Sequence, residues 1–244
     1  MSASPVFAKV NIGVKHLGRA TEIYERICGV GGDKLDAHMQ VMSFCGAAIE
    51  LQQGAETGVQ SLVFEGIDLA QSAERLTAAD VPFVHNETSI RIAADDATGV
   101  DVQLKHDVTN RPDGGTAHLD HVALCVSDLE AAARRWESIL AIDAEHMGIH
   151  PVSGGAFTAA RLLLGERMVE LISPVHGVAS NMAKRLAECG EGPVALAVPV
   201  QDVDTVKTAL EALSVRVFHN DPHWMVHPRD NDGVLLQLTS RINH

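Results

Sequence analysis

The chain repeats one order of secondary structure four times along its 244 residues, and this repetition constrains the fold more than any other feature. The clearest copy opens with the strand-like run HLDHVALCV, which ends at Ser127-Asp128, two residues typical of a helix N-cap. Apolar residues then recur at helical spacing from Leu129 to Leu140. The runs AARLLLG and ERMVELISP follow as two strands, joined by a Gly-Glu turn that favours a hairpin.

Three further copies show the same order, and all four can be aligned on their first and last strands. The first-strand positions are Lys9, Ser61, His121 and Ala195, and the last-strand positions are Glu50, Gln103, Glu170 and Gln237. The separation is roughly 42 residues in three copies and about 49 in the third, which carries an insertion. We therefore predict an α+β fold of four βαβββ modules, paired into two domains that are each a cupped mixed β-sheet with flanking helices.

A polar segment divides the four modules into two pairs. HDVTNRPDGGTAH, residues 106–118, contains Pro, Asp and paired Gly, and is typical of an interdomain linker. It predicts an N-terminal domain over residues 1–108 and a C-terminal domain over residues 116–244. Domains of this size can bury a core without disulfides or structural metals.

Charge and cysteine usage narrow the partners and the compartment. The formal net charge of -13 at pH 7 disfavours nucleic acid and membrane surfaces, although a local basic pocket can still take an anionic small molecule. The four cysteines form no CxxC pair, the N-terminal segment lacks a signal-peptide pattern, and no run has the length of a membrane helix. We expect a cytoplasmic protein that acts on a small molecule, with a homodimer as an open alternative.

Several of these segments resemble the vicinal oxygen chelate superfamily, which includes glyoxalase I, methylmalonyl-CoA epimerase, extradiol dioxygenases and bleomycin-resistance proteins. LDHVALCVSDLEAAARRWESIL looks like the strand and helix that follow a metal-binding His in that superfamily. VELISP resembles its segment with a metal-binding Glu, and HGVASNMAKRLAECGEGPVALAVPVQDVD is similar to methylmalonyl-CoA epimerases. The resemblance covers residues 117–240 well and residues 5–106 mainly in repeat order.

The resemblance implies a metal site in the second half of the chain. The superfamily's ligands come from the first and last strands of two paired modules, and these positions read His121, Glu170, Ala195 and Gln237. It therefore implies His121, Glu170 and Gln237 as ligands of a divalent metal ion such as Zn, Fe, Mn, Co or Ni, whereas Ala195 cannot ligate. Such an ion would hold two substrate oxygens and stabilise a developing enolate.

The first half departs further from this ligand pattern. Its positions read Lys9, Glu50, Ser61 and Gln103, which we interpret as a degenerate site where a Lys–Glu pair takes the metal's place. In the second half, His227 lies near the closing strand and is a candidate acid or base, with a His beside a turn as the alternative.

The leading functional hypothesis is a metal-dependent enzyme, an epimerase, isomerase or lyase resembling methylmalonyl-CoA epimerase or glyoxalase. Glu170 and His227 would move a proton at the carbon next to a substrate carbonyl. One alternative is an extradiol-type ring-cleaving dioxygenase, and the other is a non-enzymatic binding protein of the resistance type. The catalytic hypothesis requires His121 and Glu170 to lie close together on one face of a sheet.

Overall fold

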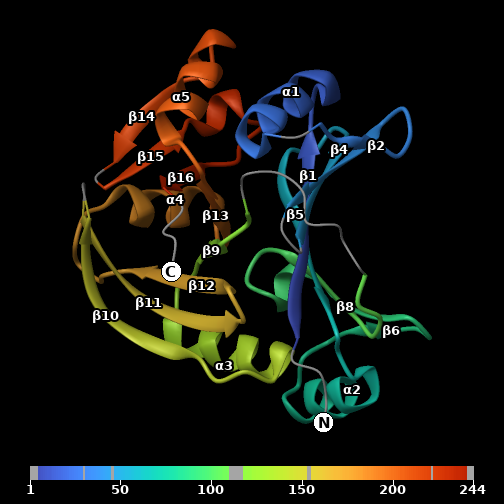
Figure 1. Ribbon diagram of the computed structural model, residues 1–244. Helices are drawn as coiled ribbons and strands as arrows, with labels where there is room; N and C mark the ends of the chain where they lie inside the picture. Colours follow the sequence, from blue (N-terminus) through green and yellow to red (C-terminus); the bar gives the residue numbers. More distant parts are fainter. Residues whose placement is uncertain are drawn as a thin grey trace. The chain divides into compact units, whose positions relative to one another are not determined.

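A computed structural model describes residues 5–29, 31–44, 47–109, 118–152, 155–220 and 222–240, and it confirms the α+β fold of four βαβββ modules (Figure 1). The first module contains β1 (Val6–Val14), α1 (Leu17–Cys28), β2 (Asp33–Lys34), β3 (Met39–Phe44) and β4 (Ala47–Gln53). The second contains β5 (Gly58–Glu65), α2 (Leu69–Ala78), β6 (Val84–His85), β7 (Ser89–Ile92), the 3-10 turn η1 (Ala94–Asp96) and β8 (Asp101–Lys105).

The other two modules repeat this order in the second half of the chain. The third contains β9 (His121–Cys125), α3 (Leu129–Leu140), β10 (Glu145–Val152), β11 (Gly155–Leu164) and β12 (Arg167–Pro174). Helix α4 (Asn181–Cys189) connects it to the fourth, which contains β13 (Gly192–Val200), α5 (Val203–Ala212), β14 (Val217–Asn220), β15 (His223–Val226), the 3-10 turn η2 (Pro228–Asp230) and β16 (Leu236–Ser240).

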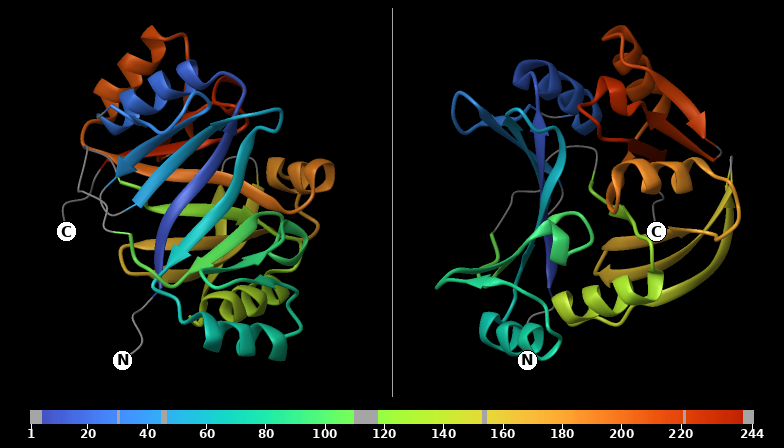
Figure 2. Two further views of the ribbon diagram at one scale, coloured as in Figure 1. Left: turned by 90° about the vertical axis from the view of Figure 1, so that its right-hand side faces the viewer. Right: turned by 180° about the vertical axis from the view of Figure 1, so that it is seen from behind.

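The strands form two eight-stranded mixed sheets with the same order of modules. The first sheet runs β2-β3-β4-β1-β5-β8-β7-β6, and the second runs β10-β11-β12-β9-β13-β16-β15-β14 (Figure 2). In each half the strand that opens a module pairs in parallel with the strand that closes it, as β1 does with β4 and β9 with β12. The predicted hairpin is confirmed, because β11 and β12 are antiparallel and joined at the Gly165-Glu166 turn.

An aspartate begins the helix in three of the four modules. Asp68, Asp128 and Asp202 each accept a backbone N–H from the first turn of α2, α3 and α5, which satisfies a donor that the helix leaves unpaired. In the first module His16 takes this position and makes no such side-chain bond. The N-cap predicted at Ser127-Asp128 is therefore confirmed at Asp128.

The modules pack into two compact units. One unit contains Leu62–Val108 and His121–Val194, so it joins the second module to the third. The other contains Ala8–Ser61 and Ala195–His244, so it joins the first module to the fourth. The predicted domains, residues 1–108 and 116–244, follow the two sheets and remain a prediction; most of the predicted linker, residues 110–117, lies outside the described residues.

Aromatic residues form the centre of the unit that joins the second and third modules. Trp136 of α3 is fully buried, its Nε1 donates to Thr98 Oγ1 at 2.8 Å, and its ring meets Phe64 edge-on at 6.1 Å between centroids. Arg75 of α2 donates through Nε to the Ser138 carbonyl at 2.7 Å. Truncating a buried Trp of this kind to Ala typically costs about 3–5 kcal/mol, so Trp136 contributes strongly to this unit.

Buried polar residues connect the first and fourth modules in the other unit. Asn231 is 2% exposed and donates through Nδ2 to the Tyr24 hydroxyl at 3.3 Å and to the Val234 carbonyl at 3.0 Å. Burial raises the pKa of the Tyr24 hydroxyl, so this hydroxyl stays neutral and able to accept. The bond fixes helix α1 of the first module to the segment after η2 in the fourth.

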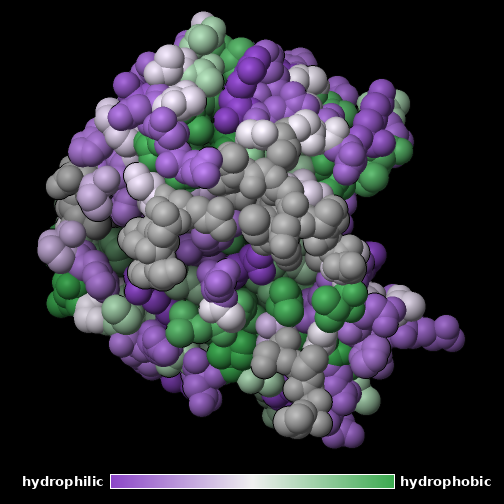
Figure 3. Space-filling model, in the orientation of Figure 1, coloured by the Kyte–Doolittle hydropathy of each residue, from purple (hydrophilic) through white to green (hydrophobic). Residues whose placement is uncertain are grey.

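The described helices and the surface in Figure 3 are consistent with the high charge of the sequence. None of the described helices has the length and apolar character needed to span a lipid bilayer. On the face shown in Figure 3, most of the coloured residues are hydrophilic, and hydrophobic residues form small separate groups. This distribution fits a chain with a net charge of -13.

Candidate functional site

His121 and Glu170 lie together on one face of the second sheet. His121 opens β9, Glu170 stands within β12, and the parallel register pairs His121 with Met168. Because residues two apart on a strand share a face, Glu170 points to the same side as Met168 and His121. The residues are 8% and 9% exposed, and His121 Nε2 is 3.8 Å from Glu170 Oε2. The proximity that the catalytic hypothesis requires is present.

The guanidinium group of Arg161 binds the other oxygen of the Glu170 carboxylate. Arg161 stands opposite Glu170 in the antiparallel register of β11 and β12, and its Nε donates to Glu170 Oε1 at 2.9 Å. The sequence analysis did not single out Arg161. Its signal was available, because a hairpin with its turn at Gly165-Glu166 places residue 161 directly across from residue 170.

In the first half, Glu50 is the carboxylate equivalent to Glu170. Its cationic partner, Lys9, comes from β1, whereas Arg161 comes from β11. The register of β1 and β4 sets Lys9 against Ala48, the same offset that sets His121 against Met168. Lys9 Nζ lies 2.6 Å from Glu50 Oε2, with side chains 20% and 15% exposed. Across from Glu50 on β3 stands Val41, an apolar residue at the place that Arg161 holds in the second half. Each half thus balances one carboxylate with one permanent cation.

The remaining ligand positions of the second half, Ala195 and Gln237, lie on strands of the other compact unit. Gln237 on β16 is half-buried and pairs with Ala197 and Met225, and Ala195 is half-buried on β13. In the first half, Ser61 accepts a hydrogen bond from Asn11 Nδ2 at 2.6 Å, and Gln103 stands opposite Arg91. The ligand roles of His121, Glu170 and Gln237 therefore remain predictions.

The donor set does not fit a resident catalytic metal. Among the described residues, no group of three or more His, Cys, Asp or Glu side chains is placed to share an ion. Of the four implied positions, only His121 and Glu170 carry strong ligands, and the Glu170 carboxylate already accepts a hydrogen bond from the cationic Arg161. A divalent ion at this carboxylate would stand beside a positive guanidinium, which opposes its binding by charge repulsion.

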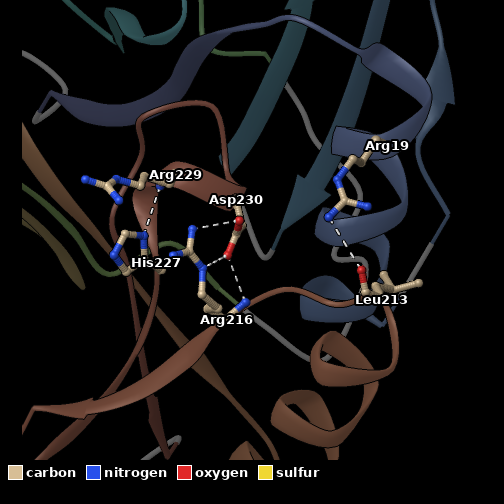
Figure 4. A network of polar contacts seen from close by, with 6 residues as sticks. All are labelled: Arg19, Leu213, Arg216, His227, Arg229 and Asp230. Carbon is tan, nitrogen blue, oxygen red and sulfur yellow. Dashed lines mark hydrogen bonds and ion pairs between the residues drawn. The ribbon is translucent and has the colours of Figure 1, made fainter.

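His227 takes a capping position in the structure (Figure 4). It precedes η2, its Nδ1 accepts the backbone N–H of Arg229 at 3.1 Å, and its ring meets Phe218 edge-on at 5.8 Å. It belongs to the compact unit that joins the first and fourth modules, whereas His121 and Glu170 belong to the other. These contacts match a histidine beside a turn, and its catalytic role stays a prediction.

Cys125 shares strand β9 with His121 but shows the properties of a core residue. Its thiol is free and fully buried. Burial raises the pKa of the Cys125 thiol, which keeps it protonated and unreactive.

Comparisons with known proteins agree with this architecture. Residues 119–237 match the family model described as Glyoxalase-like domain. Over 130 residues the chain is 28% identical to an ethylmalonyl-CoA/methylmalonyl-CoA epimerase from Cereibacter sphaeroides, a match that covers 49% of this chain and 95% of that protein.

Two solved structures resemble nearly the whole chain. A mutant of 4-hydroxymandelate synthase from Streptomyces coelicolor has a TM-score of 0.71 at 13% identity, covering 98% of this chain and 94% of that one. A 2,2',3-trihydroxybiphenyl 1,2-dioxygenase from Sphingomonas wittichii strain RW1 has a TM-score of 0.67 at 13% identity, covering 97% and 90%. At this identity, these two likenesses establish the fold alone.

The four modules and these matches define a protein with the two-domain vicinal oxygen chelate fold. Within it, residues 119–237 match the model of a glyoxalase-like domain, and this half of the chain is similar to an ethylmalonyl-CoA/methylmalonyl-CoA epimerase.

Proposed function

We propose that the second half of the chain binds a small carbonyl compound and moves a proton at the carbon next to the carbonyl, as an epimerase does. The observation that carries this proposal is the buried contact of His121 with Glu170, whose second oxygen is held by Arg161. A carboxylate and an imidazole are both able to accept and return a proton. The similarity to an epimerase over 130 residues supports the same reaction class.

In this proposal the chain's own residues supply the charges that the reaction needs. Glu170 accepts the proton, and His121, 3.8 Å away, is placed to exchange protons with the same centre. Loss of the proton leaves negative charge on the carbonyl oxygen, and a preorganised cation stabilises such charge. Arg161 is one-third exposed and directs Nε to Glu170, so its guanidinium has further N–H groups for a substrate oxygen.

The proposal is tested by isotope exchange with a panel of acyl-CoA thioesters that includes methylmalonyl-CoA and ethylmalonyl-CoA. The protein is incubated with each compound in D₂O, before and after treatment with a chelator, and deuterium at the carbon next to the carbonyl is measured by mass spectrometry. We expect enzyme-dependent exchange that survives chelation. Glu170→Gln should slow it by roughly 10²- to 10⁴-fold, the usual contribution of a positioned acid or base.

Glu166→Gln is the matched control, because Glu166 is an exposed residue of the turn that joins β11 to β12. It should leave the exchange rate unchanged. Exchange that disappears with the chelator and returns with a divalent metal would show that the site works through a metal after all. Full exchange in Glu170→Gln would remove this carboxylate from the mechanism.

Non-enzymatic binding is the second candidate, and the equivalence of the two halves favours it. Each half has a carboxylate neutralised by a cation, Glu50 by Lys9 and Glu170 by Arg161. Such a pair can also act as a fixed polar contact surface for a bound molecule. This candidate predicts that a panel compound raises the melting temperature without any deuterium exchange. A ring-cleaving dioxygenase gains no such support, because the iron ligands that the resemblance implies at 195 and 237 are replaced by Ala and Gln.

A further inference from the structure

The compact unit that joins the first and fourth modules contains a cavity of about 490 Å³. Small-molecule sites in proteins typically measure about 300–1,000 Å³, so this cavity has room for a compact organic ligand. Its walls come from the start of α1, from Thr57, and from η2 with the turn that follows it. The cavity is independent of His121 and Glu170, which lie in the other unit.

Positive side chains are concentrated at this cavity against the trend of the whole chain. Three of its ten lining residues are Lys or Arg, namely Lys15, Arg19 and Arg229, whereas the chain has 19 such residues among 244 and a net charge of -13. All three are exposed, so their charged groups can reach a ligand from solvent. A basic cavity on an acidic protein selects an anion by its local field.

The two carboxylates at the cavity are already engaged. Both carboxylate oxygens of Asp230 accept a hydrogen bond from Arg216, one from Nε at 2.6 Å and one from Nη2 at 3.0 Å (Figure 4). These hydrogen bonds lower the pKa of Asp230 to about 2, so the pair stays charged and internally neutral at physiological pH. Asp232 Oδ1 accepts the backbone N–H of Lys15 at 3.0 Å. A backbone N–H is neutral, so Asp232 keeps its negative charge and offsets one of the three cations, whereas Asp230 is neutralised by Arg216. Lys15, Arg19 and Arg229 therefore leave the cavity with a net positive charge.

The walls are held in place by contacts between the two modules. The bond from Lys15 to Asp232 and the buried bond from Asn231 to Tyr24 link the start of α1 to the segment after η2. Arg19 makes a long contact of 3.4 Å to the Leu213 carbonyl, which leaves most of its guanidinium donors for other partners (Figure 4). A cavity with fixed walls and available donors loses little entropy when it binds a ligand.

We infer that this cavity binds a small phosphate monoester. Arginine offers a planar fork and lysine a compact point charge, the two groups that proteins use most for phosphate oxygens. The half-buried Pro228 lines the same cavity and gives an apolar surface for the organic part of the ester. The combination suits a ligand with one dianionic end and one apolar end.

Isothermal titration calorimetry of the full chain with phenyl phosphate tests this inference. Phenol serves as the neutral analogue and benzoate as the carboxylate analogue. We expect binding of phenyl phosphate that weakens as salt is added, because exposed charges are screened by ions. Phenol should not bind measurably, and benzoate should bind more weakly. Equal affinity for benzoate would overturn the assignment of phosphate, and no heat with phenyl phosphate would overturn the site.

Two arginine substitutions on helix α1 distinguish binding at the cavity from a general effect of the protein's charge. Arg19→Gln should weaken phenyl phosphate binding by about fivefold, the upper range for one exposed ion pair. Arg26→Gln is the control. Arg26 lies in the last turn of the same helix, is exposed, and is not a lining residue of the cavity. Its Nη2 lies 3.9 Å from Glu22 Oε1. The same loss of affinity in both variants would refute the cavity as the binding site.

A second variant tests the cavity even if Arg19→Gln fails to fold. Thr57 also lines the cavity, so Thr57→Asp adds a negative charge there and should lower the affinity for phenyl phosphate as well. Phosphate-induced shifts in the amide NMR spectrum should include Gly233, which lines the cavity. Binding with unchanged affinity in Thr57→Asp, or with no shift at Gly233, would contradict the proposed location.

Discussion

Arg161→Met tests whether the guanidinium is the partner that stabilises Glu170. Glu170 is 9% exposed, and the substitution would remove the hydrogen bond from Arg161 at 2.9 Å. Breaking a buried ion pair from one side typically costs about 3–5 kcal/mol, because a buried charge is left without compensation. Arg161 is 33% exposed, so water screens part of this interaction, and we expect a loss of about 2 kcal/mol in the free energy of unfolding.

The assay is urea unfolding at pH 7, with the midpoint and slope measured for each variant. A loss of stability appears as a lower midpoint at an unchanged slope. Combining Arg161→Met with Glu170→Met gives a double-mutant cycle, in which contacting residues should show a coupling of about 1 kcal/mol or more. Arg134→Met is the control, since Arg134 is an exposed residue of α3 and its loss should cost less than about 0.5 kcal/mol.

The result that would refute the reasoning is a small cost without coupling. If Arg161→Met costs no more than Arg134→Met, and if the double variant shows additive losses, the ion pair does not stabilise the carboxylate. A cost of about 2 kcal/mol without coupling would point to lost packing of the Arg161 side chain instead.

Three other predictions follow from single features of the structure. Treatment with a chelator should leave the melting temperature unchanged in a thermal scan, because the donor set around Glu170 does not fit a resident metal; a marked drop would show a bound ion. Arg216→Gln should lower stability in urea at pH 6 but not at pH 2. The depressed pKa of Asp230, about 2, means that this pair stabilises the fold above the ordinary carboxyl pKa, and the stabilisation is lost as pH falls through 2. Gly18→Ala should raise stability by about 0.5 kcal/mol, because it lies in the first turn of α1 with nothing within 4 Å of an added Cβ. Gly99→Ala should lower stability instead, because its φ is +81° and an added Cβ would lie 2.1 Å from the Glu191 carbonyl oxygen; equal effects of the two alanines would contradict this account.

The local pattern of the sequence was sufficient to predict the modules. Repeated spacing, Asp128 as a helix N-cap and the Gly165-Glu166 turn each depend on residues close together in the chain. The family resemblance, rather than the local pattern, singled out His121 and Glu170 as a pair, and the structure brings them to 3.8 Å. The role of Arg161 required one further step, the cross-strand register of the hairpin.

Contacts between modules could not be predicted in this way. The grouping of the first module with the fourth depends on how helices and loops pack, and Tyr24 and Asn231 give no local signal that they will bond across 207 residues. The cavity at Arg19 and Arg229 was equally hidden, because its walls come from segments at opposite ends of the chain. Packing of distant segments follows from shape and burial rather than from a sequence period.

The different cations of the two halves make a final test of the shared geometry. Lys9 balances Glu50 from β1, and the second half uses Arg161 on β11, where the first half has Val41. Lys9→His alone copies His121 and removes the permanent cation, so it should cost about 1–2 kcal/mol in urea unfolding at pH 7, where a histidine is largely neutral. Adding Val41→Arg supplies a guanidinium across from Glu50 and should recover most of that loss. If Val41→Arg deepens the loss instead, the two carboxylates do not occupy equivalent environments, and the charge balance of one half says nothing about the other.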